Sequence, residues 1–394
     1  MTYNRRLVFT AACLGMLVFG IVLTTLGSIL PSLIERFGMD KSSAGSLFFL
    51  MSMGILAGSV VFGPIADRFG YKALLIGGLA LILAGLEIIA FAPSLAMLRL
   101  GIAITGFGGG IVNGCTNAVV ADVSEDRKTA GLAILGIFFG IGAVGMPFTL
   151  GMFIDTFGYG NVLAGVGALL AMPLVFTAAI RFPGAKHAQG LPLSQGAGLI
   201  RQPLLLLLGL MLFLQSGMEI TLGGWTATYF NEVLGLEGSQ ALLYLSLFWF
   251  GMMLARLVLG TVLRDMAPAR ILVVFIGIAF AGVLLLLLSG TRGPAAAGVF
   301  LAGAGLAAGF PVILGYVGDR YAALSGTAFS IVLVMALTGG SVLPYATGAM
   351  AESWGLRGSL IIVPAALVLQ LVLFGVVARR LAAQAVVEPE RSIH

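Results

Sequence analysis

Long apolar runs, separated by short polar segments, follow one another along the chain. A helix needs roughly 20 apolar residues to cross a bilayer, and each run reaches about this length. The runs lack the regular alternation of a barrel strand, so we predict an all-helical membrane protein with twelve spans. The predicted spans are 7–30, 43–63, 73–92, 95–120, 131–153, 161–180, 203–230, 241–263, 271–289, 295–317, 324–348 and 359–379.

One longer polar connection divides these spans into two sets of six. We expect an N-terminal six-helix half at 1–182, a cytoplasmic linker at 183–202, a C-terminal six-helix half at 203–380 and a cytoplasmic tail at 381–394. The two halves are also similar in sequence, because a shift of 197 residues superimposes special positions. These pairs include Gly20 and Gly217, Gly63 and Gly260, Asp122 and Asp319, Pro147 and Pro344, and Asp155 and Glu352. Two parallel six-helix repeats are an arrangement found in secondary transporters.

The composition agrees with lipid as the solvent of this chain. Hydrophobic residues make up 59% and charged residues 9%, whereas a soluble protein carries roughly a quarter charged residues, so a soluble enzyme is excluded. The net charge of +5 reflects topology, because most of the lysines and arginines fall on the same side as the N-terminus. This bias marks the cytoplasmic side, so we expect a cell-membrane protein with both termini in the cytoplasm and no nucleic-acid partner. The exceptions are Arg256, within a span, and Arg36, Lys41, Arg99, Arg292 and Arg357 on the opposite side.

The sequence offers no residue cluster for catalysis or for a cofactor. Cys13 and Cys115 lie in apolar runs, His187 lies in a polar loop and His394 is the last residue, so we expect no metal site. A Gly-x-x-x-x-Gly-Lys-Ser/Thr loop for ATP is also absent. We therefore expect a protein that is not an enzyme, carries no cofactor and works as a monomer.

The connection between the second and third spans carries a known motif. Residues 63–72 read Gly-Pro-Ile-Ala-Asp-Arg-Phe-Gly-Tyr-Lys, which resembles the major facilitator signature Gly-x-x-x-Asp-Arg-x-Gly-x-Lys/Arg. The resemblance implies a transporter whose two halves rock, with Asp67 and Arg68 as a charge clamp at a helix end that breaks during transport. We expect Asp122 and its repeat partner Asp319 to take part in the same gating.

Other stretches are similar to the fucose-permease group of sugar symporters within that superfamily. These stretches are 110–117, 138–142, 217–225, 248–256 and 309–311. The resemblance implies a monosaccharide as the small-molecule substrate and symport with a cation. The first and fourth spans lack the acidic residue expected of fucose permease, and Asn113 and Asn117 supply the polarity of the fourth. The coupling ion therefore stays open between a proton, which we favour, and sodium.

Three charged residues, Glu87, Glu219 and Arg256, lie well inside predicted spans, where a buried charge costs about 2.5–3.5 kcal/mol and so needs a reason. Glu219 lies near the middle of the seventh span, one turn after Gln215 on the same face. We expect Glu219 to bind the solute and to couple transport by taking up a proton, the alternative being a structural pairing between helices. Arg256 is expected to couple or gate, or to pair with Asp319 or, less easily, with Glu219. Glu87 is expected to snorkel to the membrane interface or to pair helices rather than to take part in transport.

Uncharged polar and aromatic residues complete the predicted solute site. Asn113 and Asn117 share one face of the fourth span, and asparagine donates and accepts hydrogen bonds, which suits sugar hydroxyls. Trp225, Trp249 and Phe310 can stack on the apolar face of a pyranose ring, although a single aromatic residue in a membrane helix is more often a packing residue. The predicted substrate-binding residues are Asn113, Asn117, Gln215, Glu219, Trp225, Trp249 and Phe310.

These features predict a secondary active transporter that moves a small polar solute, a monosaccharide, across the lipid bilayer by alternating access coupled to protons. One alternative is an exporter of an amphipathic drug or metabolite that works by cation antiport. Another is a membrane sensor, which binds a ligand without exchanging it across the membrane.

Overall fold

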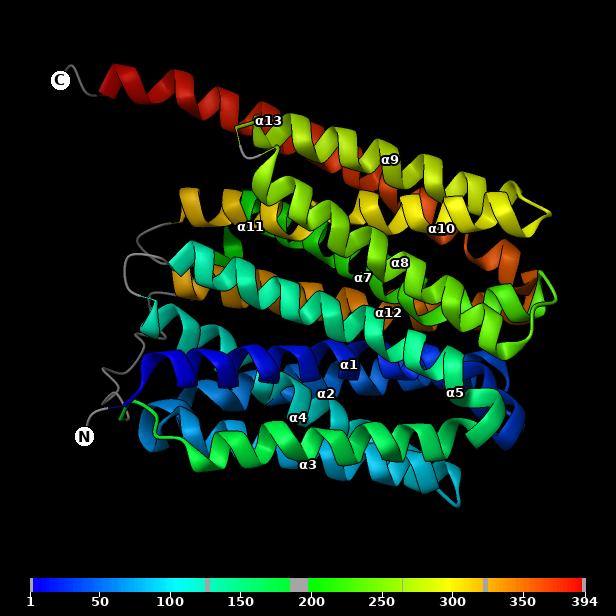
Figure 1. Cartoon of the computed structure of the whole chain (residues 1–394). Coiled ribbons are helices and arrows are strands. Elements are labelled where there is room, and N and C mark those ends of the chain that lie inside the picture. Colours follow the sequence, from blue (N-terminus) through cyan, green and yellow to red (C-terminus); the bar gives the residue numbers. More distant parts are fainter. Residues whose placement is uncertain (1–2, 125–127, 185–197, 264, 322–324, 392–394) are drawn as a thin grey trace.

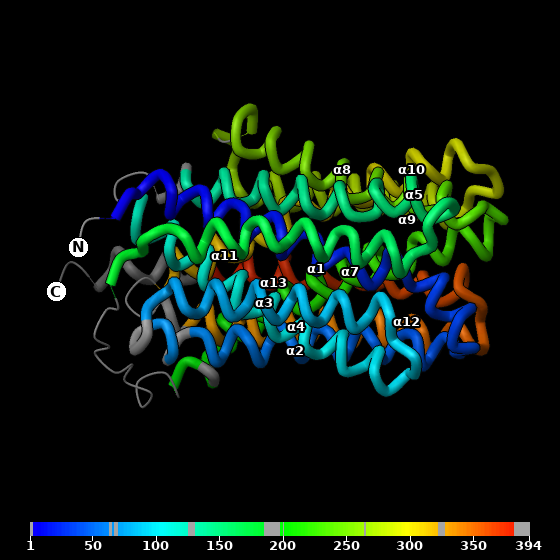
Figure 2. Tube along the Cα trace, turned by 60° about the horizontal axis from the view of Figure 1, so that its bottom comes forward, coloured from blue at the N-terminus to red at the C-terminus, as the bar shows by residue number. Residues whose placement is uncertain are grey.

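The computed structural model describes residues 3–124, 128–184, 198–263, 265–321 and 325–391, apart from some of their side chains. This described part of the chain is helical, and it contains no strand. The helices lie side by side along a common direction, as Figure 1 and, from another angle, Figure 2 show. Helix α1 begins at the same end of the bundle at which α13 ends. We call this end the terminus end and the opposite one the far end.

The helices agree with the predicted spans except at two places. They are α1 (Arg5–Phe37), α2 (Lys41–Phe69), α3 (Tyr71–Phe91), α4 (Leu95–Val123), α5 (Lys128–Ala179), the 3-10 helix η2 (Leu199–Arg201), α7 (Pro203–Glu232), α8 (Gly238–Thr261), α9 (Pro268–Leu288), α10 (Arg292–Leu306), α11 (Gly309–Arg320), α12 (Ser325–Ser359) and α13 (Ile362–Arg391). Within the described residues, 11 segments are long and apolar enough to cross a membrane, not twelve, because the predicted spans 131–153 and 161–180 are joined within α5. The predicted span 295–317 is instead divided between α10 and α11.

Helix α5 is interrupted by a glycine whose backbone is not helical. Gly158 has a φ of 73° and a ψ of 156°, a region that glycine enters without the steric cost of a side chain. Figure 1 shows the chain turn back toward the terminus end at this point. Helix α12 contains the same feature at Gly355, with a φ of 68°. The two glycines are related by the 197-residue shift of the sequence repeat.

Close contacts between helices follow the same shift. A Cβ atom on Gly106 of α4 would lie 2.5 Å from the carbonyl oxygen of Met51, and one on Gly303 of α10 would lie 2.0 Å from that of Phe248. Both glycines therefore allow two helix backbones to touch, as small residues do in membrane bundles. Two more glycine contacts recur after 197 residues. The contact of Gly54 with Ala103 corresponds to that of Gly251 with Phe300, and the contact of Gly85 with Gly101 corresponds to that of Gly282 with Gly298. The sequence repeat is thus also a repeat of helix contacts.

Three helix pairs make the main contacts between the first part of the chain and the last. Helix α1 packs against α7, α2 against α12, and α5 against α8. Helix α7 also packs against α8, so α8 lies against both α5 and α7. The polar groups described next lie where these three helices meet.

Candidate solute site

A buried carboxylate on α7 faces an arginine on α8. Glu219 lies near the middle of α7, and its side chain is 7% exposed, whereas that of Arg256 is 30% exposed. Arg256 Nη2 lies 3.8 Å from Glu219 Oε1, which is an ion pair but too long for a direct hydrogen bond. We expected Arg256 to reach Asp319 more easily than Glu219, and this order is wrong. The reason is that α7 and α8 pack directly together, while Asp319 is exposed near the end of α11.

Glu219 of α7 and Trp249 of α8 each carry a buried polar atom that is unsatisfied. Glu219 Oε2 and Trp249 Nε1 have no hydrogen-bond partner among the described residues. Trp249 packs on Gly223, one helical turn after Glu219, where a Cβ atom would lie only 2.7 Å from Trp249 Cζ2. The indole and the carboxylate therefore line the same stretch of α7. A buried polar atom without a partner costs free energy, so an acceptor and a donor are available here for a bound molecule.

Phe139 of α5 forms the third wall of this site, and our sequence reasoning did not single it out as a site residue. The guanidinium carbon of Arg256 lies 5.8 Å from the centre of the Phe139 ring, a cation–π contact. The same ring lies 6.3 Å from Trp249, edge to face, and 5.9 Å from Phe19 of α1. Phe139 belongs to a stretch that resembles sugar symporters, but no sequence signal shows that its ring meets a cation of α8.

The two predicted asparagines form a separate polar patch on α4. Asn117 Nδ2 donates hydrogen bonds to Asn113 O at 2.9 Å and to Asn113 Oδ1 at 3.1 Å, and both residues are half-buried. Helix α4 packs against α1, α2, α3 and α5. No hydrogen bond in the described part of the chain joins the asparagines to Glu219 or Arg256. Phe310, the second residue of α11, is also half-buried.

Gln215 and Trp225 hold helices together in this structure. Gln215 Nε2 donates to Leu306 O at 2.8 Å, where α10 ends, and Gln215 Oε1 accepts from Gln370 Nε2 at 3.2 Å. The fully buried Trp225 donates its Nε1 hydrogen to Pro344 O of α12 at 3.0 Å. Their hydrogen-bonding groups are therefore occupied by contacts between helices.

The residues expected to gate lie toward the terminus end. Tyr71 donates its hydroxyl hydrogen to Asp122 Oδ2 at 2.7 Å, which ties α3 to α4. Asp319 is exposed near the end of α11. Asp67 and Arg68 belong to the last turn of α2, and their side chains lie outside the described part of the structure.

The third intramembrane ionisable residue, Glu87 of α3, lies at a helix contact. A Cβ atom on Gly167 of α5 would lie 2.5 Å from Glu87 Oε1, so the carboxylate lies directly against α5. This position agrees with a role in helix pairing.

At the far end, α2 is tied to both α7 and α12. Lys41 Nζ forms an ion pair with Glu232 at the end of α7. The carboxylate of Glu352 on α12 accepts hydrogen bonds from the backbone N–H groups of Lys41 and, at 3.3 Å, of Ser42. It thus caps the first turn of α2 from another helix, where a negative charge is favourable. The sequence signalled these residues only as members of the repeat or as cations on the non-cytoplasmic side.

Farther along the helices from this cap, α1 lies close to the backbone of α7, and α2 lies close to that of α12. A Cβ atom on Gly27 of α1 would lie 2.3 Å from Gly223 O of α7. Ser52 of α2 donates its hydroxyl hydrogen to Gly340 O of α12 at 3.3 Å. We call these contacts, together with those of Lys41 and Glu352, the far-end seam.

A bundle of membrane-length helices around a buried ion pair defines a multi-pass membrane protein with a polar interior, the class that includes solute transporters. The sequence pattern of the Major Facilitator Superfamily matches residues 12–297, and the chain belongs to this family. It is therefore a membrane transporter of the major facilitator type, with the all-helical fold of that family.

Two relatives and two solved structures agree with this assignment. The "Uncharacterized transporter y4wD" of Sinorhizobium fredii is 26% identical over 356 residues, which cover 87% of this chain and 91% of the relative. The "Sodium-dependent glucose transporter 1" of Rattus norvegicus is 31% identical over 140 residues, 36% of this chain and 28% of the relative. The nucleoside transporter NupG has a TM-score of 0.80 at 15% identity, covering 95% of this chain and 99% of that one. A D-xylose-proton symporter has a TM-score of 0.76 at 15% identity, covering 93% and 96%. At this identity, the structures show the fold alone.

Proposed function

We propose that the chain is a secondary active transporter with twelve spans in two six-helix halves. The segment Gly131–Ala179 has 49 residues, which as one helix would extend about 74 Å, more than twice the ~30 Å of the hydrocarbon core. A segment of this length accounts for two spans, with the turn at Gly158. The repeat of backbone contacts after 197 residues supports two equivalent halves, which meet at the α1–α7, α2–α12 and α5–α8 contacts.

The proposed orientation has the terminus end in the cytoplasm of a cell-membrane protein. Most lysines and arginines belong to segments of this end, and positive residues are retained on the cytoplasmic side during insertion. The far-end seam then closes the route to the outside. The proposed cytoplasmic gating residues are Asp67, Arg68, Asp122 and Asp319. They would form contacts that close the terminus end when the far-end seam opens.

The proposed substrate is a small polar solute, a monosaccharide. The observation that carries this proposal is that the buried atoms Glu219 Oε2 and Trp249 Nε1 have no hydrogen-bond partner among the described residues. A sugar hydroxyl can donate to Glu219 Oε2, and another can accept from Trp249 Nε1. The rings of Trp249 and Phe139 supply apolar faces of the kind on which a pyranose stacks. Among the other predicted residues, Asn113, Asn117 and Phe310 would contact the solute from the opposite half or from α11. Gln215 and Trp225 would act through the positions of α10 and α12.

Proton coupling is proposed at the ion pair itself. When Glu219 takes up a proton, its attraction to Arg256 is lost, and the guanidinium becomes free to bind the solute or to move with α8. An intramembrane carboxylate that pairs with a neighbouring cation is a common element of proton relays. Sodium is the alternative ion for the same carboxylate.

Counterflow tests the transport proposal. Purified protein in proteoliposomes preloaded with one hexose should accumulate the labelled sugar, and the screen should cover several monosaccharides at two pH values, with and without sodium. Acceleration by low pH supports a proton, and acceleration by sodium supports that ion. Exchange of hydrophobic cations but of no sugar would overturn the sugar proposal in favour of an exporter, and binding without exchange would identify a sensor.

A further inference from the structure

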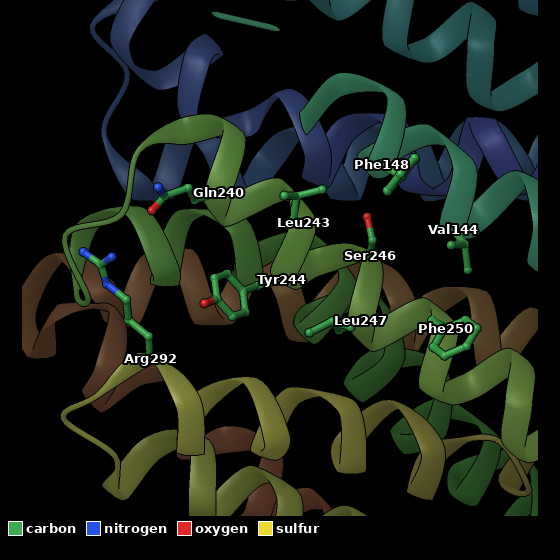
Figure 3. A pocket seen from close by; sticks show the side chains of 9 residues that line it. All are labelled: Val144, Phe148, Gln240, Leu243, Tyr244, Ser246, Leu247, Phe250 and Arg292. Atoms are coloured by element: carbon green, nitrogen blue, oxygen red, sulfur yellow. The ribbon is translucent and has the colours of Figure 1, made fainter. Parts of the chain in front are cut away.

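A groove separate from the solute site opens between α5, α8 and α10. Its volume is about 650 Å³. Figure 3 shows the side chains that line it, which come from one face of α8, from α5 and from the first residue of α10. Because α5 and α8 belong to different proposed halves, the groove lies along the seam between them.

The walls of the groove are apolar and face outward. Phe148 is 47% exposed, Leu243 is 41% exposed and Phe250 is 40% exposed. Along α8 the groove extends from Gln240 to Phe250, ten residues or about 15 Å, which is half of the ~30 Å hydrocarbon core. The groove therefore has the depth of one leaflet and begins at the far end, where α8 starts.

The mouth of the groove is polar and positively charged. Arg292 is the first residue of α10, is exposed, and has no ion-pair or hydrogen-bond partner in the described part of the chain. The first turn of α10 also lacks a side-chain cap, so its N–H groups add positive potential. Figure 3 shows Arg292 and Gln240 together at this end, with the hydroxyl of Tyr244 directed toward Arg292.

We propose that this groove binds a membrane phospholipid with an anionic headgroup, one acyl chain lying along α8 and the phosphate at Arg292. Arginine pairs with phosphate through two parallel N–H donors, and Gln240 and Tyr244 supply further donors. The groove is apolar and as deep as one leaflet, and the unpaired Arg292 lies at its mouth. This shape and charge match those of such a lipid. The bound lipid contacts α5 and α8, one helix from each proposed half.

The lipid site does not depend on the proposed solute. Successive residues of a helix are rotated by about 100° around its axis. Trp249 and Arg256 therefore lie on one face of α8, and Leu247 and Phe250 lie on another. The groove therefore lies on a different face of α8 from the candidate solute site. Substitutions of the groove residues leave the contacts of Glu219 and Arg256 intact.

Native mass spectrometry of the purified full-length protein tests this proposal, with phosphatidylglycerol and phosphatidylcholine added in increasing amounts. We expect phosphatidylglycerol to bind more tightly, and Arg292→Gln to weaken its binding about fivefold and to remove the preference. Arg99→Gln is the matched control, because Arg99 is an exposed arginine in the first turns of α4, the repeat counterpart of α10. Leu243→Trp should fill the groove and weaken both lipids. Leu254→Trp is its control, since Leu254 is equally exposed on α8 but does not line the groove.

Two results would overturn the proposal. Equal losses in Arg292→Gln and Arg99→Gln would mean that phosphatidylglycerol associates with the general surface. Unchanged binding in Leu243→Trp, in protein whose thermal midpoint is that of the wild type, would mean that no acyl chain occupies the groove. If Leu243→Trp does not fold, Val144→Trp on α5 places the same bulk in the groove from its other wall.

Discussion

Arg256 of α8 lies between Glu219 of α7, at 3.8 Å, and the ring of Phe139 of α5, at 5.8 Å. One guanidinium thus contacts an anion on α7 and an aromatic face on α5. Any change in the charge of Glu219 alters the attraction that holds this cation, and with it the contact between α8 and α5. This relationship makes the ion pair the first place to test coupling.

Glu219→Gln should separate coupling from exchange. Glutamine keeps the size and hydrogen-bonding groups of the side chain but takes up no proton. We expect accumulation driven by a pH gradient in proteoliposomes to fall about tenfold or more, because coupling needs a group that changes its protonation state. Counterflow, which needs no net proton movement, should be retained.

Glu87→Gln is the control for this variant, because Glu87 is also an intramembrane glutamate and lies against α5 away from the ion pair. It should accumulate solute as the wild type does. Uphill accumulation by Glu219→Gln at the wild-type level would show that Glu219 is not the coupling group. An equal loss in both variants would point to a general effect on the helices.

Arg256→Gln should lower stability by leaving the carboxylate of Glu219 buried without its cation. Because Arg256 is 30% exposed, we expect a loss of about 1–3 kcal/mol, less than for a fully buried pair. The double variant Glu219→Gln/Arg256→Gln should recover part of this loss, and thermal unfolding of all four proteins completes a double-mutant cycle. Strictly additive losses would mean that the two side chains do not interact in the folded protein.

Glu352→Ala should open the far-end seam, because it removes one of the two carboxylates that cap the first turn of α2, the other being Asp40. Loss of a cap costs about 1 kcal/mol, which corresponds to about a fivefold shift in an equilibrium. Ser52→Cys reports the shift, since Ser52 is buried in the seam and the native cysteines are buried. A membrane-impermeant thiol reagent should label this cysteine about fivefold faster in the Glu352→Ala background.

The matched control is Asp155→Ala. Asp155 is the repeat counterpart of Glu352 and is likewise exposed, but it makes no hydrogen bond to α8 within the described residues. It should leave the labelling rate unchanged. Equal acceleration by both substitutions would mean that the cap does not hold the seam.

Asp40 should make the start of α2 sensitive to acid. Its carboxylate caps the helix by accepting a hydrogen bond from Ser43 N at 2.6 Å, and hydrogen bonds from Ser43 lower the pKa of Asp40 below its usual value. Since the folded state has the lower pKa, the cap stabilises the protein fully above the unfolded pKa of about 3.9 and is lost as the pH falls through the folded pKa. Asp40→Ala should therefore lower the thermal midpoint at neutral pH, and the difference from wild type should shrink at about pH 3. A difference that is independent of pH would show that the ionised carboxylate is not the cap.

Hydropathy predicted nearly every helix because lipid demands long apolar segments with internally satisfied backbones. It did not predict the division between α10 and α11, where Gln215 of α7 donates a hydrogen bond to Leu306 O at the end of α10. The importance of Glu219 was predictable for a related reason, since a charge in an apolar run is costly wherever its partner lies. The partner itself was less predictable, because Arg256 was expected to reach Asp319 more easily than Glu219.

The sequence by itself determined the class of protein, the positions of the helices and the 197-residue repeat, because these depend on local apolarity and on patterns along one chain. Only the tertiary structure decided which polar atoms meet. It placed Trp249, Arg256 and Phe139 around Glu219, used Gln215 and Trp225 to join helices, and brought Glu352 to the start of α2 across more than 300 residues of chain. Such pairings depend on how the helices rotate and approach one another, and in a membrane this is set by small residues and close backbone packing that leave little trace in hydropathy.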